Sequence, residues 1–125
     1  MSTIKRTNLN QSQAEEYAYS EIVEAGDFIF LTFCAPAVGG SIEAQIHSVL
    51  DQMEQRLTAV GLALPSVVKI DVLMKDPWNI PAMEKVFKER FKGAYPARKT
   101  IATDFAVTGG DGSLGVQIDA IAYRK

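Results

Sequence analysis

A strand with apolar side chains on both faces is the feature that most constrains how this chain folds. The strand covers residues 28–33, FIFLTF. Alternation divides it into two apolar sets, Phe28 and Phe30 on one side and Ile29, Leu31 and Phe33 on the other. A strand of this kind is covered on both faces. Residues 20–26 predict a second strand, joined to the first by a hairpin turn at Gly26-Asp27.

Two helices are expected to cover one face of the sheet. Residues 41–61 are the clearer one, with Ser41 as N-cap and Gly61 at the end. Their apolar stripe is Ile42, Ile46, Val49, Leu50, Met53, Leu57 and Val60. A second helix follows Asn79 as N-cap and tolerates Pro81 in its first turn. It directs inward Ile80, Met83, Val86, Phe87 and Phe91.

Three further strands complete the expected sheet. Residues 66–75 lie between the helices and direct Val68, Ile70, Val72 and Met74 to one face. Residues 99–107 and 114–124 form a second hairpin through a turn at 108–113. The order is β-β-α-β-α-β-β, with room for a short strand near Ile4. This pattern predicts an α+β fold in which residues 1–125 form a single domain.

The last strand indicates that the molecule is an oligomer. One of its faces is apolar, with Leu114, Val116, Ile118, Ala120 and Ala122. The other mixes polar and apolar groups, namely Gln117, Asp119, Ile121 and Tyr123. If the helices cover the first face, apolar groups remain on an uncovered face. Such a sheet usually meets another copy of itself.

Composition and charge argue against several classes of function. The formal net charge is -2 and no stretch is densely basic, so we expect no nucleic-acid partner. No apolar run is long enough to span a membrane, and the N-terminus has no secretory signal. The cytoplasm is therefore the expected location. The turn at 108–113, TGGDGS, lacks the Lys-Ser/Thr ending of a phosphate loop.

Two candidate reactive groups have simpler interpretations. His47 lies on one helix face with Glu43, Asp51 and Glu54, a spacing that could suit a metal. We interpret this cluster as a solvated helix face with pairs at i,i+4, because a single histidine makes a weak site. The single cysteine, Cys34, is interpreted as a buried small hydrophobe rather than a reactive thiol. No metal and no cofactor are expected.

Arg98 is the strongest candidate for a binding residue. It follows Tyr95-Pro96-Ala97 at the start of a strand, and this rigid lead-in limits where its guanidinium points. A fixed guanidinium suits a planar carboxylate, which it holds with two parallel hydrogen bonds. The alternative is a surface arginine paired with an acidic side chain. The residues alone leave both interpretations open.

Four stretches of the chain resemble the Rid family, also called YjgF-like or L-PSP proteins. They are residues 19–33, YSEIVEAGDFIFLTF; residues 42–76, which contain the first helix and third strand; residues 95–100, YPARKT; and residues 116–125, VQIDAIAYRK. The third is similar to the family's Pro-Ala-Arg-Ser/Thr signature. The fourth is similar to its closing Glu-Ile-Glu-Ala-Ile-Ala. Together they cover nearly the whole chain.

This resemblance implies a chorismate-mutase-like fold, with a mixed sheet and two helices on one face, in a homotrimer. Ligand clefts would lie between the subunits. The implied activity is hydrolysis of 2-imino and enamine acids to 2-keto acids and ammonia. Arg98 matches the arginine that holds the substrate carboxylate, and Tyr19 and Thr100 match cleft residues. The backbone around Phe33 or Cys34 would contact the ligand.

The chain departs from the family pattern at several positions. Gln117 stands where the family has a water-orienting glutamate, and a glutamine cannot act as a base near neutral pH. Thr-Phe-Cys at residues 32–34 replaces Ser-Gly-Gln, which should narrow or reshape the cleft. Residues 35–40 and 91–96 are shorter than usual. Asp119 is expected to have a mainly structural role.

The sequence therefore predicts a trimer that binds small carboxylates or 2-imino acids between subunits and hydrolyses imines, weakly or on an atypical substrate. Arg98 and Gln117 are the predicted catalytic residues. The alternative is a non-catalytic binding or sensing trimer that uses the same cleft. An RNA-cleaving protein ranks third, because the chain is slightly acidic and has only one histidine.

Overall fold

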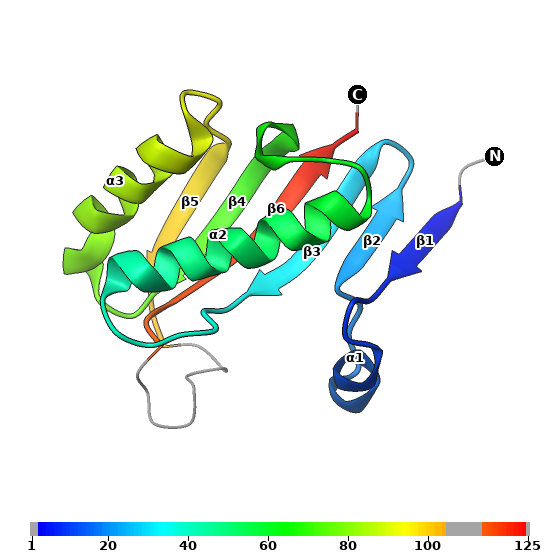
Figure 1. The fold of residues 1–125 in the computed structure, drawn as a ribbon, viewed down its shortest axis with the longest axis horizontal. Coiled ribbons are helices and arrows are strands. Elements are labelled where there is room, and N and C mark those ends of the chain that lie inside the picture. Colours follow the sequence, from blue (N-terminus) through cyan, green and yellow to red (C-terminus); the bar gives the residue numbers. More distant parts are fainter. Residues whose placement is uncertain (1–2, 105–113, 125) are drawn as a thin grey trace.

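A six-stranded mixed sheet forms the body of the protein (Figure 1). The computed structural model describes residues 3–104 and 114–124. The strands are β1 (Ile4–Thr7), β2 (Ile22–Ala25), β3 (Phe28–Cys34), β4 (Val67–Met74), β5 (Ala97–Ala102) and β6 (Val116–Tyr123). Their order in the sheet is β1-β2-β3-β6-β4-β5. Only β4 and β5 are parallel; the other pairs are antiparallel. The predicted α+β class, the β2–β3 hairpin and the short strand near Ile4 are confirmed.

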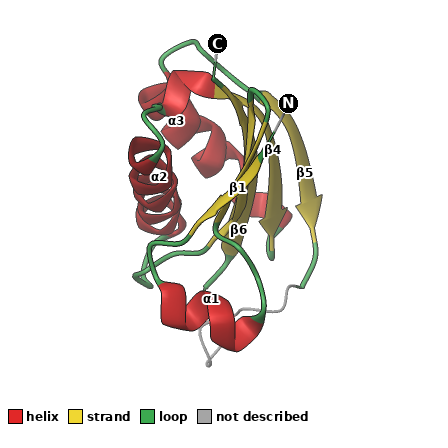
Figure 2. Ribbon diagram, turned by 90° about the vertical axis from the view of Figure 1, so that its right-hand side faces the viewer, coloured by secondary structure: helices red, strands yellow, loops and turns green. Residues whose placement is uncertain are grey.

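Two helices cover one face of this sheet, as predicted (Figure 2). They are α2 (Ile42–Ala59) and α3 (Ile80–Phe91). The core between helices and sheet is built from the two predicted stripes and from the strand residues Ile22, Ile29, Leu31, Ile70, Val72, Met74, Val116 and Ile118. No helix in the described part of the chain is long and apolar enough to cross a membrane. We call the opposite face of the sheet, which no described element covers, the outer face.

The helix ends follow local chemistry, with one difference from expectation. The Ser41 hydroxyl accepts a hydrogen bond from the Ala44 amide at 3.1 Å, so Ser41 is the N-cap of α2 as predicted. Asn79 precedes α3, but its side chain makes no capping bond. Asp76 instead accepts a bond from the Trp78 amide, which caps the short 3-10 helix Pro77–Asn79 in front of α3. That turn has already satisfied the chain before α3 begins.

The expected second hairpin is wrong. β5 pairs in parallel with β4, and β6 lies between β3 and β4, so β5 and β6 are not neighbours. The connection from β4 through α3 is long enough to make β5 a parallel edge strand. β5 also ends at Ala102, earlier than predicted, and the predicted turn at 108–113 lies outside the described residues.

Two bulges overturn the simple alternation of side chains. On β3, Leu31 pairs with Ala120 and Cys34 with Ile118, so β3 contains one extra residue there. After this bulge Cys34 enters the core, while Phe33 lines a cavity on the outer face. A second register shift between Val67 and Lys69 buries Val67 and leaves Val68 exposed, contrary to prediction.

A short helix near the N-terminus was not predicted. α1 (Gln11–Tyr17) lies at one end of the sheet, beside β1 and β2 (Figure 1). Its only buried residue is Ala14, so it has no apolar stripe to reveal it. The available signal was Asn10, whose side chain accepts a bond from the Gln13 amide and caps the helix.

Candidate functional site

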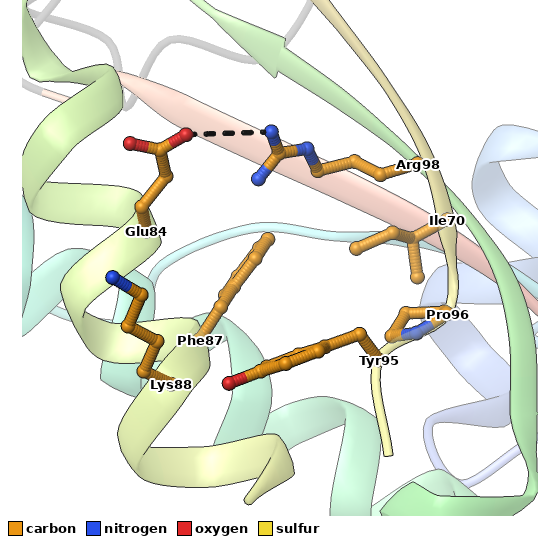
Figure 3. A pocket seen from close by; sticks show the side chains of 7 residues that line it. All are labelled: Ile70, Glu84, Phe87, Lys88, Tyr95, Pro96 and Arg98. Atoms are coloured by element: carbon orange, nitrogen blue, oxygen red, sulfur yellow. Dashed lines mark ion pairs between the residues drawn. The ribbon is translucent and has the colours of Figure 1, made fainter. Parts of the chain in front are cut away.

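Arg98 lies at the mouth of a cavity of about 450 Å³ between α3 and the start of β5 (Figure 3). The apolar part of the wall consists of Ile70, Phe87, Tyr95 and Pro96. The charged part consists of Glu84, Lys88 and Arg98. A small cavity with an apolar wall and a few polar groups is the usual form of a small-molecule site.

The parallel pairing of β5 with β4 directs Arg98 into this cavity. Arg98 stands opposite Ile70, whose side chain faces the helices, and paired residues of parallel strands share a face. Because β5 is an edge strand, the guanidinium remains one-third exposed. Pro96, just before the strand, contributes to the cavity wall.

The guanidinium of Arg98 has a long contact with an acidic side chain. Its Nη2 lies 3.7 Å from Oε2 of Glu84, and the two side chains are 33% and 48% exposed (Figure 3). This distance exceeds that of a hydrogen bond, and exposed pairs of this kind contribute little to stability. Arg98 therefore has an acidic partner, but the contact leaves its donors open to a ligand.

Thr100 shares the face of Arg98 two residues along β5, opposite Val72. Its hydroxyl oxygen is buried and has no hydrogen-bond partner among the described residues. A buried hydroxyl without a partner is costly, so this group is suited to receive a bond from outside the described chain. The structure thus groups Arg98 with Thr100, as the resemblance implies.

Tyr19 and Phe33 lie together elsewhere, at the end of β3. Their ring centroids are 6.1 Å apart. Both line a second cavity of about 290 Å³, whose wall includes Glu21, Gln52 and Arg56. Gln52 accepts a hydrogen bond from the Ala35 amide at 3.0 Å and so holds the chain that follows the strand.

Gln117 lines a third cavity, of about 150 Å³, on the outer face. Phe33, Asp71 and Asp119 also contribute to its wall. Burial and the neighbouring Asp71 raise the pKa of the Asp119 carboxyl. A hydrogen bond from Lys69 lowers the pKa of Asp71. A polar wall of this composition can orient a water molecule.

The predicted site residues do not converge within one chain. Arg98 and Thr100 face the helices from the edge strand β5, whereas Gln117 faces the opposite side of the sheet. β5 and β3 are separated by β4 and β6, a distance of roughly 14 Å at the usual strand spacing. Phe33 meets both Tyr19 and Gln117, but Arg98 meets none of the three.

A buried ion pair, which sequence reasoning missed, shapes the bulge at Phe33. The Arg56 Nη1 donates to the carbonyl oxygens of Thr32 and Phe33 at 3.0 and 2.9 Å. Its Nε lies 3.4 Å from the Glu21 carboxylate, without hydrogen-bond geometry, and both side chains are less than 10% exposed. The other Glu21 oxygen accepts a bond from the Asn10 amide at 2.7 Å. The signal was an arginine within the apolar stripe of residues 41–61, since a buried arginine needs an acidic partner.

Cys34 is a buried neutral thiol, as predicted. Its side chain lies inside the core, and burial raises the pKa of the thiol to about 11. The Arg56 guanidinium, 3.2 Å from the sulfur, opposes this shift only in part. A thiol with this pKa is protonated at neutral pH and is a poor nucleophile. Any contact of this residue with a ligand would use its backbone.

The His47 cluster has a structural role between the two helices. Arg90 of α3 lies 3.0 Å from the His47 Nδ1 and 2.8 Å from the Asp51 carboxylate, and it also bonds Glu54. A cation therefore occupies the position that a metal would need. Nowhere in residues 3–104 and 114–124 do three or more histidine, cysteine or acidic side chains form a metal-binding group.

Comparison with known proteins agrees with the fold and the motifs. The model of the "Endoribonuclease L-PSP" family matches residues 10–123. A RutC family protein of Pyrococcus horikoshii is 32% identical over 114 residues, which cover 86% of this chain and 87% of that protein. The solved structure of a Streptococcus pyogenes protein of the yjgF family is 50% identical, with a TM-score of 0.87, and covers 100% of this chain and 99% of that one.

A relative with a named activity is more distant. A 2-iminobutanoate/2-iminopropanoate deaminase of Dermatophagoides farinae is 27% identical over 90 residues, which cover 66% of this chain and 70% of that protein. The family match spans nearly all of the chain, and it includes the strand that carries Arg98. The chain therefore belongs to the L-PSP endoribonuclease family, whose members are also called YjgF or Rid proteins.

Proposed function

We propose that this protein binds small carboxylates with Arg98 in a cleft between subunits and hydrolyses 2-imino or enamine acids to 2-keto acids and ammonia. The observation that carries the proposal is the Arg98 guanidinium, which stands at a cavity with its donors open. The family includes a 2-iminobutanoate/2-iminopropanoate deaminase. Buried arginines of this chain, by contrast, are bonded to its own backbone.

The cleft requires a second copy of the chain, and we propose a homotrimer. Phe28, Phe30, Ile101 and Tyr123 are exposed on the outer face, although they are large and apolar. Their burial against other copies would remove this surface from water. A neighbouring copy would also bring its own Tyr19, Phe33 and Gln117 toward the Arg98 edge, which one chain cannot do. A stable monomer in light scattering at micromolar concentration would contradict this assembly.

The proposed reaction needs little chemical assistance from the protein. Arg98 holds the carboxylate of the iminium form with two parallel hydrogen bonds. Gln117 holds a water molecule, which attacks the iminium carbon. The tetrahedral adduct transfers a proton to nitrogen, releases ammonia and leaves the 2-keto acid. Because the iminium carbon is already electrophilic, correct positioning supplies most of the acceleration.

The binding half of this proposal is tested by calorimetry with a 2-keto acid. Arg98→Ala should weaken binding by roughly 1.5–3 kcal/mol, the scale of a hydrogen bond to a charged group. Arg124→Ala is a matched control, since Arg124 is also a partly exposed arginine in an ion pair and lies outside this cavity. Unchanged affinity in Arg98→Ala would show that Arg98 is an ordinary surface arginine.

The catalytic half is tested at Gln117. Gln117→Glu should raise the rate of imine hydrolysis, by up to about 10²-fold, because a carboxylate can accept the proton that an amide cannot. If this variant is no faster while Asp119→Asn abolishes activity, Asp119 holds the water instead.

Gln117 also favours a second candidate function, a non-catalytic carboxylate-binding or sensing trimer. A family member without an acid-base residue at this position could bind the same ligands without converting them. Binding that depends on Arg98, with no hydrolysis of any 2-imino acid by the parent or by Gln117→Glu, would establish this alternative.

A further inference from the structure

We infer that Glu84 makes the Arg98 cavity selective for ligands that carry a cationic nitrogen beside their carboxylate. This inference rests on the proposed function, because it assumes that Arg98 holds the carboxylate. Glu84 and Arg98 project into the same cavity from different elements, α3 and β5 (Figure 3). They present an anion and a cation side by side at its mouth.

The geometry leaves both charges accessible to a ligand. At 3.7 Å the contact is longer than a hydrogen bond, so neither group is fully engaged by the other. Within the described part of the chain, Arg98 is the only ion-pair partner of Glu84. Both side chains are partly exposed, which makes their rearrangement around a ligand inexpensive.

The other wall groups define what the ligand looks like. Lys88 also lines the cavity, so its three ionic groups carry a net positive charge that attracts a carboxylate. In a 2-iminium or 2-amino acid, the carboxylate and the nitrogen are attached to neighbouring carbon atoms or to one carbon and its substituent. A molecule of this size can place the carboxylate on Arg98 and the nitrogen on Glu84. The apolar wall of Ile70, Phe87 and Pro96 would receive an apolar side chain.

This arrangement would also distinguish substrate from product. Hydrolysis replaces the cationic nitrogen with a neutral ketone oxygen, while the carboxylate remains. Glu84 then faces an oxygen lone pair beside a second carboxylate, which is electrostatically unfavourable. Glu84 forms and breaks no bond in this scheme. It determines specificity by favouring the iminium form and helping the keto acid to leave.

The test uses two ligands that differ only at the nitrogen. Leucine has the stable cationic nitrogen of the substrate class, and 4-methyl-2-oxopentanoate is its 2-keto counterpart. We expect the parent protein to bind leucine more tightly in calorimetry. Glu84→Gln should weaken leucine binding and strengthen keto acid binding, which would change the ratio of the two dissociation constants by roughly tenfold or more.

A matched control lies on the same helix. Glu89→Gln makes the same charge change at a similarly exposed position, but Glu89 pairs with His47 and lies outside the cavity. This control should leave the ratio unchanged. An equal change in Glu89→Gln would mean that the general charge of the protein, not contact with Glu84, sets the preference, and would overturn the inference.

The outcomes separate this inference from the proposed function. If Arg98→Ala weakens both ligands but Glu84→Gln leaves their ratio unaltered, Glu84 does not set selectivity and the carboxylate clamp stands. If the parent prefers the keto acid, the inference is also wrong. If Arg98→Ala alters neither ligand, the proposed function itself fails.

Discussion

Two arginines in this protein have similar chemistry and opposite surroundings. Arg56 is almost fully buried, and its guanidinium is bonded to the carbonyl oxygens of the β3 bulge and lies beside the Glu21 carboxylate. Arg98 is one-third exposed at a cavity, with one long contact to Glu84. The first guanidinium holds the chain in shape, whereas the second has donors left for a ligand. The number of bonds that an arginine makes within its own chain therefore indicates its role.

The difference follows from where each residue enters the structure. Arg56 lies in the apolar stripe of α2, so it can be buried only with an acidic partner and several acceptors. Arg98 lies on an edge strand, where solvent reaches the guanidinium and no such network is required. If this comparison is correct, the two residues should differ strongly in their effects on stability and on ligand binding.

The largest expected effect is on stability at Arg56. Arg56→Leu should lower the free energy of unfolding by roughly 3–5 kcal/mol, because it leaves the Glu21 carboxylate buried without its partner. Urea denaturation measures this loss. The double variant Arg56→Leu with Glu21→Gln should recover part of it, because the uncompensated charge is removed. A loss below about 1 kcal/mol would mean that the buried network is not stabilising the bulge.

The next effect concerns the thiol beside Arg56. The pKa of Cys34 is raised from its ordinary 9.0 to about 11 in the folded chain. Between these values the unfolded chain loses the proton while the folded chain keeps it, so stability falls as pH rises from about 9 to 11. The shift corresponds to a loss of roughly 2–3 kcal/mol.

This loss can be isolated by comparison with Cys34→Ala. The difference in unfolding free energy between parent and variant should be constant below about pH 8 and shrink by this amount up to about pH 11. Urea titrations at a series of pH values provide the measurement. A difference that does not vary with pH would show that the buried thiol titrates normally.

Ligand binding at Arg98 should show a smaller, graded effect. Arg98→Lys should lose roughly 1 kcal/mol of affinity for a 2-keto acid, less than Arg98→Ala, because lysine keeps the charge but not the planar fork. Calorimetry on parent and both variants orders the three affinities. Equal affinity of the lysine variant and the parent would rule out a two-bond grip on the carboxylate.

The smallest expected effect is on stability at Arg98. Arg98→Ala should change the free energy of unfolding by less than about 1 kcal/mol, since its pair with Glu84 is long and partly exposed. Urea denaturation beside Arg56→Leu makes the comparison direct. A loss as large as that of Arg56→Leu would assign Arg98 a structural role and remove the contrast between the two residues.

Local pattern was sufficient to predict much of this molecule. The stripes of α2 and α3, the Ser41 cap and the β2–β3 hairpin depend on residues close in sequence, so the sequence by itself determined them. The Pro-Ala-Arg motif likewise marked Arg98 before its cavity was known. Both helices were expected on one face, because two apolar stripes need one apolar sheet face to bury them.

Only the tertiary structure decided what depends on distant partners. The position of β6 between β3 and β4 separates β5 from its neighbour in sequence, and the bulge at Phe33 reverses the faces of Phe33 and Cys34. Neither can be read from alternation, because pairing free energies are shared among strands far apart in the chain. The same holds for Arg56 with Glu21 and for Arg98 with Glu84. Sequence named the charged residues, but the packed chain chose which carboxylate each one meets and how much water remains between them.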